Sequence, residues 1–211
     1  MRHPIRVLVP ALAVLTAAGT LTGCLGTEAK PDRAAALPSS PTPSATATKA
    51  AAGSIGAPGS ACDLPVSFGL AADWKPEAVK ATDDEVFAAL GRQGPATMVC
   101  EVDAKPAGNI GYLRVWTAGK GPARTALEGF VKAEKNTSKV SYKETKAGAL
   151  PAVEVTYTVY NKLMEESKEE RAFAVAAPKG TVIVHLGGLD SAEHRAMIPA
   201  YDLARSTLKP L

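Results

Sequence analysis

The sequence predicts an α+β fold over residues 62–211, with one mostly antiparallel sheet of about six to seven strands and two main helices. Short runs in this region alternate apolar and polar side chains, a pattern that is typical of strands. Short turns separate most of these runs, and strands joined by short turns pair antiparallel. The main helical patterns stand apart from the strands, which favours an α+β domain over a parallel α/β one.

The first half of this domain predicts three strands and a short helix. Residues 66–70 alternate like a strand, and further strands are predicted at 97–102 and 112–118. The last of these is apolar on both sides, so we expect it in the middle of the sheet. A capping box at 82–85 predicts a helix over 83–90. Its buried side is expected to consist of Val86, Phe87 and Leu90.

Two longer helices enclose four further strands. The first helix begins at Pro122, carries an apolar stripe from Ala123 to Val131 and ends near Asn136. The strands are predicted at 139–145, 153–160, 171–177 and 181–186. Residues 161–170 are strongly charged and predict a solvated hairpin. Asp190 opens the closing helix, whose apolar face runs from Met197 to Leu208 and which contains Pro199.

The N-terminal residues 1–23 have the features of a secretory signal peptide. A basic start is followed by an uncharged apolar run over 7–18, which is shorter than the roughly 20 residues that span a bilayer. Leu21-Thr22-Gly23-Cys24 resembles the lipobox of bacterial lipoproteins of actinobacterial type. This resemblance implies cleavage before Cys24, a diacylglycerol on its sulfur, and attachment to the outer face of the cytoplasmic membrane. The alternatives are a soluble secreted protein and a single uncleaved membrane helix.

Residues 24–61 predict a lipidated cysteine followed by a disordered tether. This segment is almost entirely Ala, Pro, Ser, Thr and Gly, and it lacks apolar periodicity and aromatic residues. It therefore cannot bury enough surface to offset its chain entropy.

Cys62 and Cys100 are the two cysteines left if Cys24 is acylated. In an oxidising compartment they predict a disulfide bond, whereas the alternative, a metal pair, lacks further Cys or His nearby. We therefore expect no metal site and no cofactor.

The folded part resembles the PsbP/Mog-type α/β/α sandwich, a fold that includes lipoproteins. The resemblance rests on the order of elements, on Val66-Ser67-Phe68 followed by Trp74, and on the strand-rich middle closed by a helix. Members of this fold family bind partner proteins or have no known activity, so the resemblance implies little chemistry.

Four sequence patterns suggest chemistry, and each has a simpler structural interpretation. Gly119 to Arg124 begins like a phosphate-binding glycine motif but is expected to be a plain turn. Ser206-Thr207-Leu208-Lys209 fits S-x-x-K, although the accompanying motifs of β-lactam-recognising enzymes are missing. His185 is expected to be a hydrogen-bonded residue on a strand face, and His194 lies in a first helical turn. The acidic residues of 165–170 are expected to be solvated, and we predict no catalytic residue.

The folded part has as many acidic as basic residues, so no nucleic-acid partner is expected. Three functional hypotheses remain. The first is a non-enzymatic module, anchored by its lipid, that binds an envelope protein or a cell-wall component. The second is a carrier of a small apolar ligand, which requires a cavity of a few hundred Å³. The third is a hydrolase, which requires a buried group with a perturbed pKa in a cleft.

Overall fold

A computed structural model describes residues 51–82 and 84–211. The predicted signal peptide, the lipobox with Cys24 and most of the tether lie outside these residues. The helices are α1 (Glu85–Leu90), the 3₁₀ helix η1 (Lys105–Ala107), α2 (Ala123–Ala133) and α3 (Ser191–Thr207). The strands are β1 (Gly53–Ile55), β2 (Val66–Leu70), β3 (Lys75–Ala78), β4 (Arg92–Gln93), β5 (Ala96–Asp103), β6 (Gly111–Ala118), β7 (Thr137–Ala147), β8 (Leu150–Asn161), β9 (Glu166–Ala177), β10 (Gly180–Gly188) and β11 (Lys209–Pro210).

Eight strands form the main sheet, in which all neighbours pair antiparallel. Its order is β3-β5-β6-β10-β9-β8-β7, and β4 adds to β5. A separate small sheet has the order β1-β2-β11. The predicted α+β class is confirmed. The main sheet is larger than predicted because β3 and β4 are too short to show a pattern, and the predicted strand at 66–70 belongs to the small sheet.

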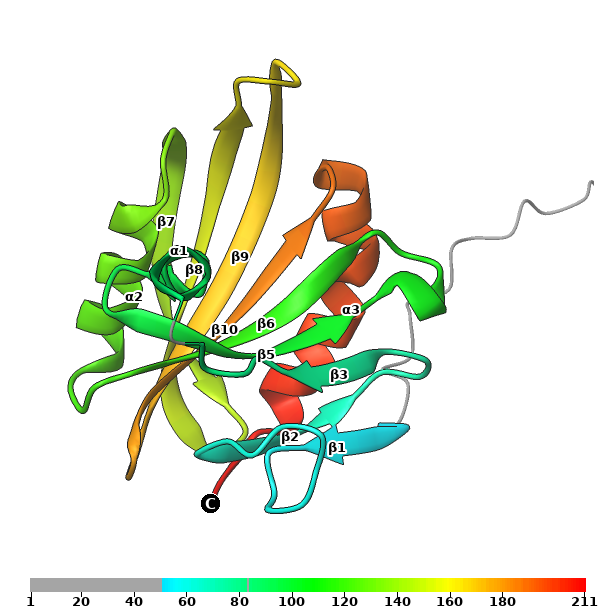
Figure 1. Cartoon of the computed structure of the whole chain (residues 1–211), viewed down its shortest axis with the longest axis vertical. Coiled ribbons are helices and arrows are strands. Elements are labelled where there is room, and N and C mark those ends of the chain that lie inside the picture. The colour runs from blue at the N-terminus through cyan, green and yellow to red at the C-terminus, as the bar shows by residue number, and fades with distance from the viewer. Residues whose placement is uncertain (1–50, 83) are drawn as a thin grey trace, which may run out of the picture. The chain divides into compact units, whose positions relative to one another are not determined.

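The two main helices cover opposite faces of the main sheet (Figure 1). α2 packs with Leu127 and Phe130 against residues from β6, β8, β9 and β10. α3 packs with Met197 and Tyr201 on the other face, in a cluster that also includes β2 of the small sheet. Each helix places one apolar stripe against the sheet, as expected for an amphipathic helix on a half-buried surface.

Strand β10 runs through the centre of the main sheet, and all of its residues are buried. Val182, Val184 and Leu186 belong to the cluster on the α3 face, whereas Ile183 belongs to the cluster on the α2 face. The same face as Ile183 carries His185, two residues further along the strand. A polar side chain is thereby placed in the middle of the domain.

Three predictions about local structure are wrong. Ordered structure begins before Cys62, because β1 pairs with β2 and Ile55 is buried. Val86 and Leu90 are each 71% exposed, because the short helix α1 packs mainly beside β4 and leaves these two side chains uncovered. The region 161–170 is not wholly solvated, because β9 begins at Glu166 and Glu170 is only 4% exposed.

Candidate functional site

A buried polar cluster lies on the α2 face of the sheet and is centred on Glu170. One carboxylate oxygen, Oε1, lies 2.7 Å from Lys168 Nζ, and the other, Oε2, lies 2.8 Å from His185 Nε2. Lys168 also donates to the backbone carbonyl of Gly188 at 3.3 Å. Lys168 therefore compensates Oε1, whereas Oε2 lies close to the His185 ring without a hydrogen bond of good geometry among the described residues.

The strand register explains why these groups meet. In the β9–β10 pair, Glu170 lies opposite Gly187 and His185 lies opposite Ala172, so Glu170 and His185 are diagonal neighbours. Gly187 and Ala172 leave the space between them open. A Cβ atom added to Gly187 would lie 3.2 Å from Glu170 Oε2 and 3.3 Å from His185 Cε1. Glu170 and His185 can therefore pack this closely only because Gly187 has no side chain.

Electrostatics fix the charge of Glu170. Burial raises the pKa of its carboxyl group, but the neighbouring His185 and Lys168 outweigh burial, so the pKa is lower than usual. The Tyr157 hydroxyl lies 3.2 Å from His185 Nε2. Burial, and then the Glu170 charge, raise the pKa of Tyr157 well above its usual value. At neutral pH this cluster thus contains an ionised carboxylate beside a neutral phenol.

A second ion pair continues the row of polar groups across the sheet. In register, Glu101 on β5 lies opposite Arg114 on β6, which lies opposite His185 on β10. Arg114 Nε donates to Glu101 Oε1 at 2.7 Å, and the guanidinium also lies over the Tyr112 ring at 4.8 Å from its centroid. Within the described part of the chain, the two terminal guanidinium nitrogens of Arg114 have no hydrogen-bond partner.

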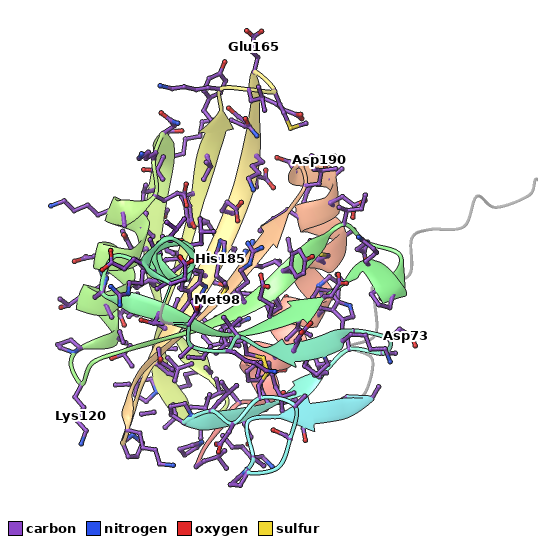
Figure 2. The ribbon with its side chains drawn as sticks, viewed as in Figure 1. Asp73, Met98, Lys120, Glu165, His185 and Asp190 are labelled. Atoms are coloured by element: carbon purple, nitrogen blue, oxygen red, sulfur yellow. A yellow bond between two sulfur atoms is a disulfide. The ribbon has the colours of Figure 1, made fainter. Side chains whose placement is uncertain are left out.

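These residues border an open groove of about 290 Å³, here called the central groove. Its principal polar lining comes from Arg114, Trp116, Glu134, Lys168, Glu170 and His185. Leu90, Met98 and Val159 supply apolar lining. Figure 2 shows His185 and Met98 near the middle of the domain, with Glu165 at the hairpin tip and Lys120 at the opposite end. The groove is therefore built mostly on sheet strands and not on loops.

Two nitrogens of the groove residues are buried without a partner among the described residues. They are Trp116 Nε1 and His185 Nδ1. Trp116 is only 5% exposed, and its ring packs edge-on against Phe130, with 5.2 Å between the ring centroids. Phe130 also contacts the His185 ring, at 5.6 Å between centroids. Buried polar atoms without partners are rare in folded proteins, and each of them calls for a structural or functional explanation.

The other patterns from the sequence are not brought to this site. The predicted plain turn is present just before α2. There the hydroxyl of Thr181, a residue of β10, donates to the carbonyl of Gly121. Arg124 pairs with Glu128 and lies over Tyr142 instead of facing an anion site. Ser206 donates to the carbonyl of Leu203 at the end of α3.

His194 is buried in the first turn of α3, away from the central groove lining. Burial lowers the pKa of its imidazole, and its Nδ1 has no partner in the described structure. Sequence reasoning missed Glu170, Arg114 and Trp116 as site residues. An available signal was the alternation of Lys168, Glu170 and Ala172, which places all three on one face of an extended β9.

Residues 31–208 match the family described as uncharacterised lipoprotein. The chain belongs to this family. A search of the curated proteins finds no match to this lipoprotein. Family membership fits a lipid-anchored, membrane-associated protein. Within the described residues of the lipoprotein, no helix is long and apolar enough to cross a membrane.

The lipoprotein has the predicted disulfide bond between Cys62 and Cys100, whose Cα atoms lie 6.0 Å apart. Both cysteines are buried in the cluster on the α3 face. The bond joins the segment between β1 and β2 to strand β5, and therefore ties the small sheet to the main sheet. Among residues 51–82 and 84–211, no three His, Cys, Asp or Glu side chains converge as possible metal ligands.

Proposed function

We propose that this lipoprotein is a non-enzymatic binding module of the cell envelope that takes up its ligand in the central groove. The observation that carries this proposal is the array of half-buried Lys168 with buried Glu170 and His185, beside the Trp116 Nε1 that has no partner among the described residues. These groups stand on neighbouring strands, so their positions are fixed before a ligand arrives. Such preorganisation lowers the entropy cost of binding.

The protonation chemistry of the groove favours binding over hydrolysis. A general base needs a nitrogen or oxygen that can reach the proton of a substrate or water. In His185, Nε2 is engaged by Glu170 and Tyr157, and Nδ1 is buried. The carboxylate of Glu170 pairs with Lys168, lies beside His185 and has a lowered pKa, which makes it a weak base. Among the described residues that line the groove, none is a Ser, Thr or Cys nucleophile.

The proposal places the domain outside the cytoplasmic membrane, held by a diacylglycerol on Cys24. The lipobox-like sequence 21–24 and the match to a lipoprotein family support this location. We also propose an actinobacterial origin and a PsbP/Mog-type sandwich. The layering of α2, the main sheet and α3 supports the latter.

The alternative of an apolar carrier has a candidate site of its own in a second groove. A second groove of about 280 Å³, here called the α3 groove, lies between α3 and the residues that follow β2. Its lining includes Trp74, Met197 and Leu203. This groove is open and is not an internal cavity, so it offers an apolar ligand less burial than a typical carrier site does.

The two tryptophans of the chain distinguish these functions, because Trp116 lines the central groove and Trp74 lines the α3 groove. The mature lipoprotein, labelled with ¹⁵N in detergent micelles, should give two indole N–H signals, which the Trp74→Phe variant assigns. We expect a small-molecule and wall-fragment extract of the envelope to shift the Trp116 signal. A shift of Trp74 alone would favour the apolar carrier, and no shift of either would contradict both.

The non-enzymatic part of the proposal has a separate test. The lipoprotein is incubated at catalytic concentration with the same extract, and the extract is compared by mass spectrometry before and after. We expect an unchanged composition. A product that accumulates with wild-type protein but not with His185→Phe would show that the groove catalyses a reaction.

A further inference from the structure

We propose that the central groove binds a ligand with a single carboxylate attached to an apolar body. This inference rests on the proposed binding function and adds the chemical class of the ligand. Two sources share this chemistry: a fatty acid and the free C-terminus of a short peptide. Some polar groups of the groove are already engaged, and those that are not indicate this class of ligand.

The acidic groups of the buried array are already engaged. Glu170 is held by Lys168 and His185, and Glu101 accepts from Arg114. The free hydrogen-bonding capacity on β6 therefore consists of donors. These are the terminal nitrogens of Arg114, which lack a described partner, and the Nε1–H of Trp116. A ligand that satisfies them must present acceptors.

The arrangement of these donors suits a carboxylate. Arg114 and Trp116 are two residues apart on β6, so both side chains lie on the same face of the sheet. Glu101 fixes the guanidinium through Nε and leaves both terminal nitrogens for a planar, two-oxygen acceptor. A charge-assisted bond in a partly desolvated groove is roughly twice as strong as a neutral one.

One acidic residue limits the charge of the ligand. Glu134 at the end of α2 lines the groove, and it has no ion-pair partner within the described residues. The lining includes two basic residues, Arg114 and Lys168, and two acidic residues, Glu134 and Glu170. Glu134 therefore repels a monoanion that pairs with Arg114 less strongly than it repels a dianion such as a phosphate monoester.

The apolar part of the lining accounts for the rest of the ligand. Leu90, Met98 and Val159 border the groove, and Leu90 stands largely in water. An apolar ligand body that covers Leu90 removes this exposed surface from solvent. This contact would also explain why α1 carries an apolar side chain at Leu90 that the domain itself leaves exposed.

The test uses matched acids and amides with the full mature lipoprotein in detergent micelles. The probes are octanoate and octanamide, and N-acetyl-alanyl-leucine and its C-terminal amide. Binding is followed by the Trp116 indole signal and by calorimetry. We expect at least one acid to bind ten-fold or more tightly than its amide. A preference for octanoate identifies a lipid-derived acid, and a preference for the peptide identifies a C-terminus; both support the proposal.

Variants separate the groove from non-specific binding. Arg114→Gln should weaken acid binding ten-fold or more. Trp116→Phe removes the indole N–H but retains an aromatic ring, and it should weaken acid binding several-fold. Arg195→Gln is the matched control, because Arg195 pairs with Glu169 at the surface at 3.2 Å and does not line the groove. Circular dichroism and thermal melts confirm that each variant is folded.

A failure of every acid to shift the Trp116 signal would overturn the carboxylate proposal, and so would either of two results with acids that bind. One is equal affinity for acid and amide, and the other is acid binding that Arg114→Gln leaves unchanged. If the envelope extract shifts the Trp116 signal but none of the acids does, the carboxylate class is wrong and the binding function stands. If neither extract nor acids shift Trp116, both proposals fail.

Discussion

Loss of the Cys62–Cys100 disulfide should destabilise the domain by an amount that the chain connectivity sets. The two cysteines are separated by 38 positions, and closing a loop of that length removes about 4 kcal/mol of entropy from the unfolded chain at 25 °C. A domain of ordinary stability has about 5–15 kcal/mol in total, so this is a large share. We expect the melting temperature to fall by about 8–16 °C, at about 2–4 °C per kcal/mol.

The assay is urea denaturation of the mature lipoprotein with and without a thiol reductant. The double variant Cys62→Ala/Cys100→Ala is the control, because its curve should not respond to reductant. Alanine is preferred to serine, since both positions are buried in an apolar cluster and a hydroxyl there would lack a partner. A stability loss below about 1 kcal/mol would refute the loop-closure reasoning. Thiols that react in the native wild-type protein would refute the disulfide itself.

Three further predictions concern the anchor, the polar cluster and pH. Cys24→Ala should move the protein from the membrane fraction to the supernatant. The wild-type lipoprotein, reduced and denatured, should show two titratable thiols, those of Cys62 and Cys100. A third thiol would exclude acylation of Cys24. Gly187→Ala should destabilise the fold by about 1–3 kcal/mol in urea denaturation. The control Gly119→Ala should have little effect, because nothing lies within 4 Å of the new Cβ. Equal losses of stability in the two variants would contradict the close packing of Glu170 and His185. Because burial lowers the pKa of His194, the unfolded state binds more protons, and stability should fall as the pH drops below about 6.5. The lowered pKa of Glu170 acts in the same direction and adds a further loss of stability below about pH 4.5. The His194→Phe variant should lack the loss that begins near pH 6.5 and keep the loss at lower pH. If the variant shows the same dependence of stability on pH as the wild type, the burial argument for His194 is wrong.

Local patterns were sufficient for most of the fold. The alternation in 153–160 and 181–186 predicted strands that form the centre of β8 and β10, and the apolar stripe after Pro122 predicted the face that α2 buries. Strand and helix periodicities are properties of consecutive residues, so the sequence expresses them directly. The disulfide was also accessible, because its two cysteines were the pair left after Cys24 was assigned to the anchor.

The candidate site could not be predicted in the same way, because it depends on which strands become neighbours. Glu170 looked like one more charge in a solvated hairpin, and only the pairing of β9 with β10 places it against His185. Similarly, the exposure of Leu90 follows from the position of α1 at the sheet edge and not from its own pattern.

The sequence by itself predicted a lipoprotein, which the family match supports, and an α+β class, which the structure confirms. Each of these follows from composition or from contacts between near neighbours along the chain. Tertiary structure alone decided that Arg114, Trp116, Lys168, Glu170 and His185 border one groove. Those residues come from three strands whose order in the sheet, β6-β10-β9, differs from their order in the chain. Long-range strand pairing is a property of the whole fold, and so is the environment that it gives to each charge.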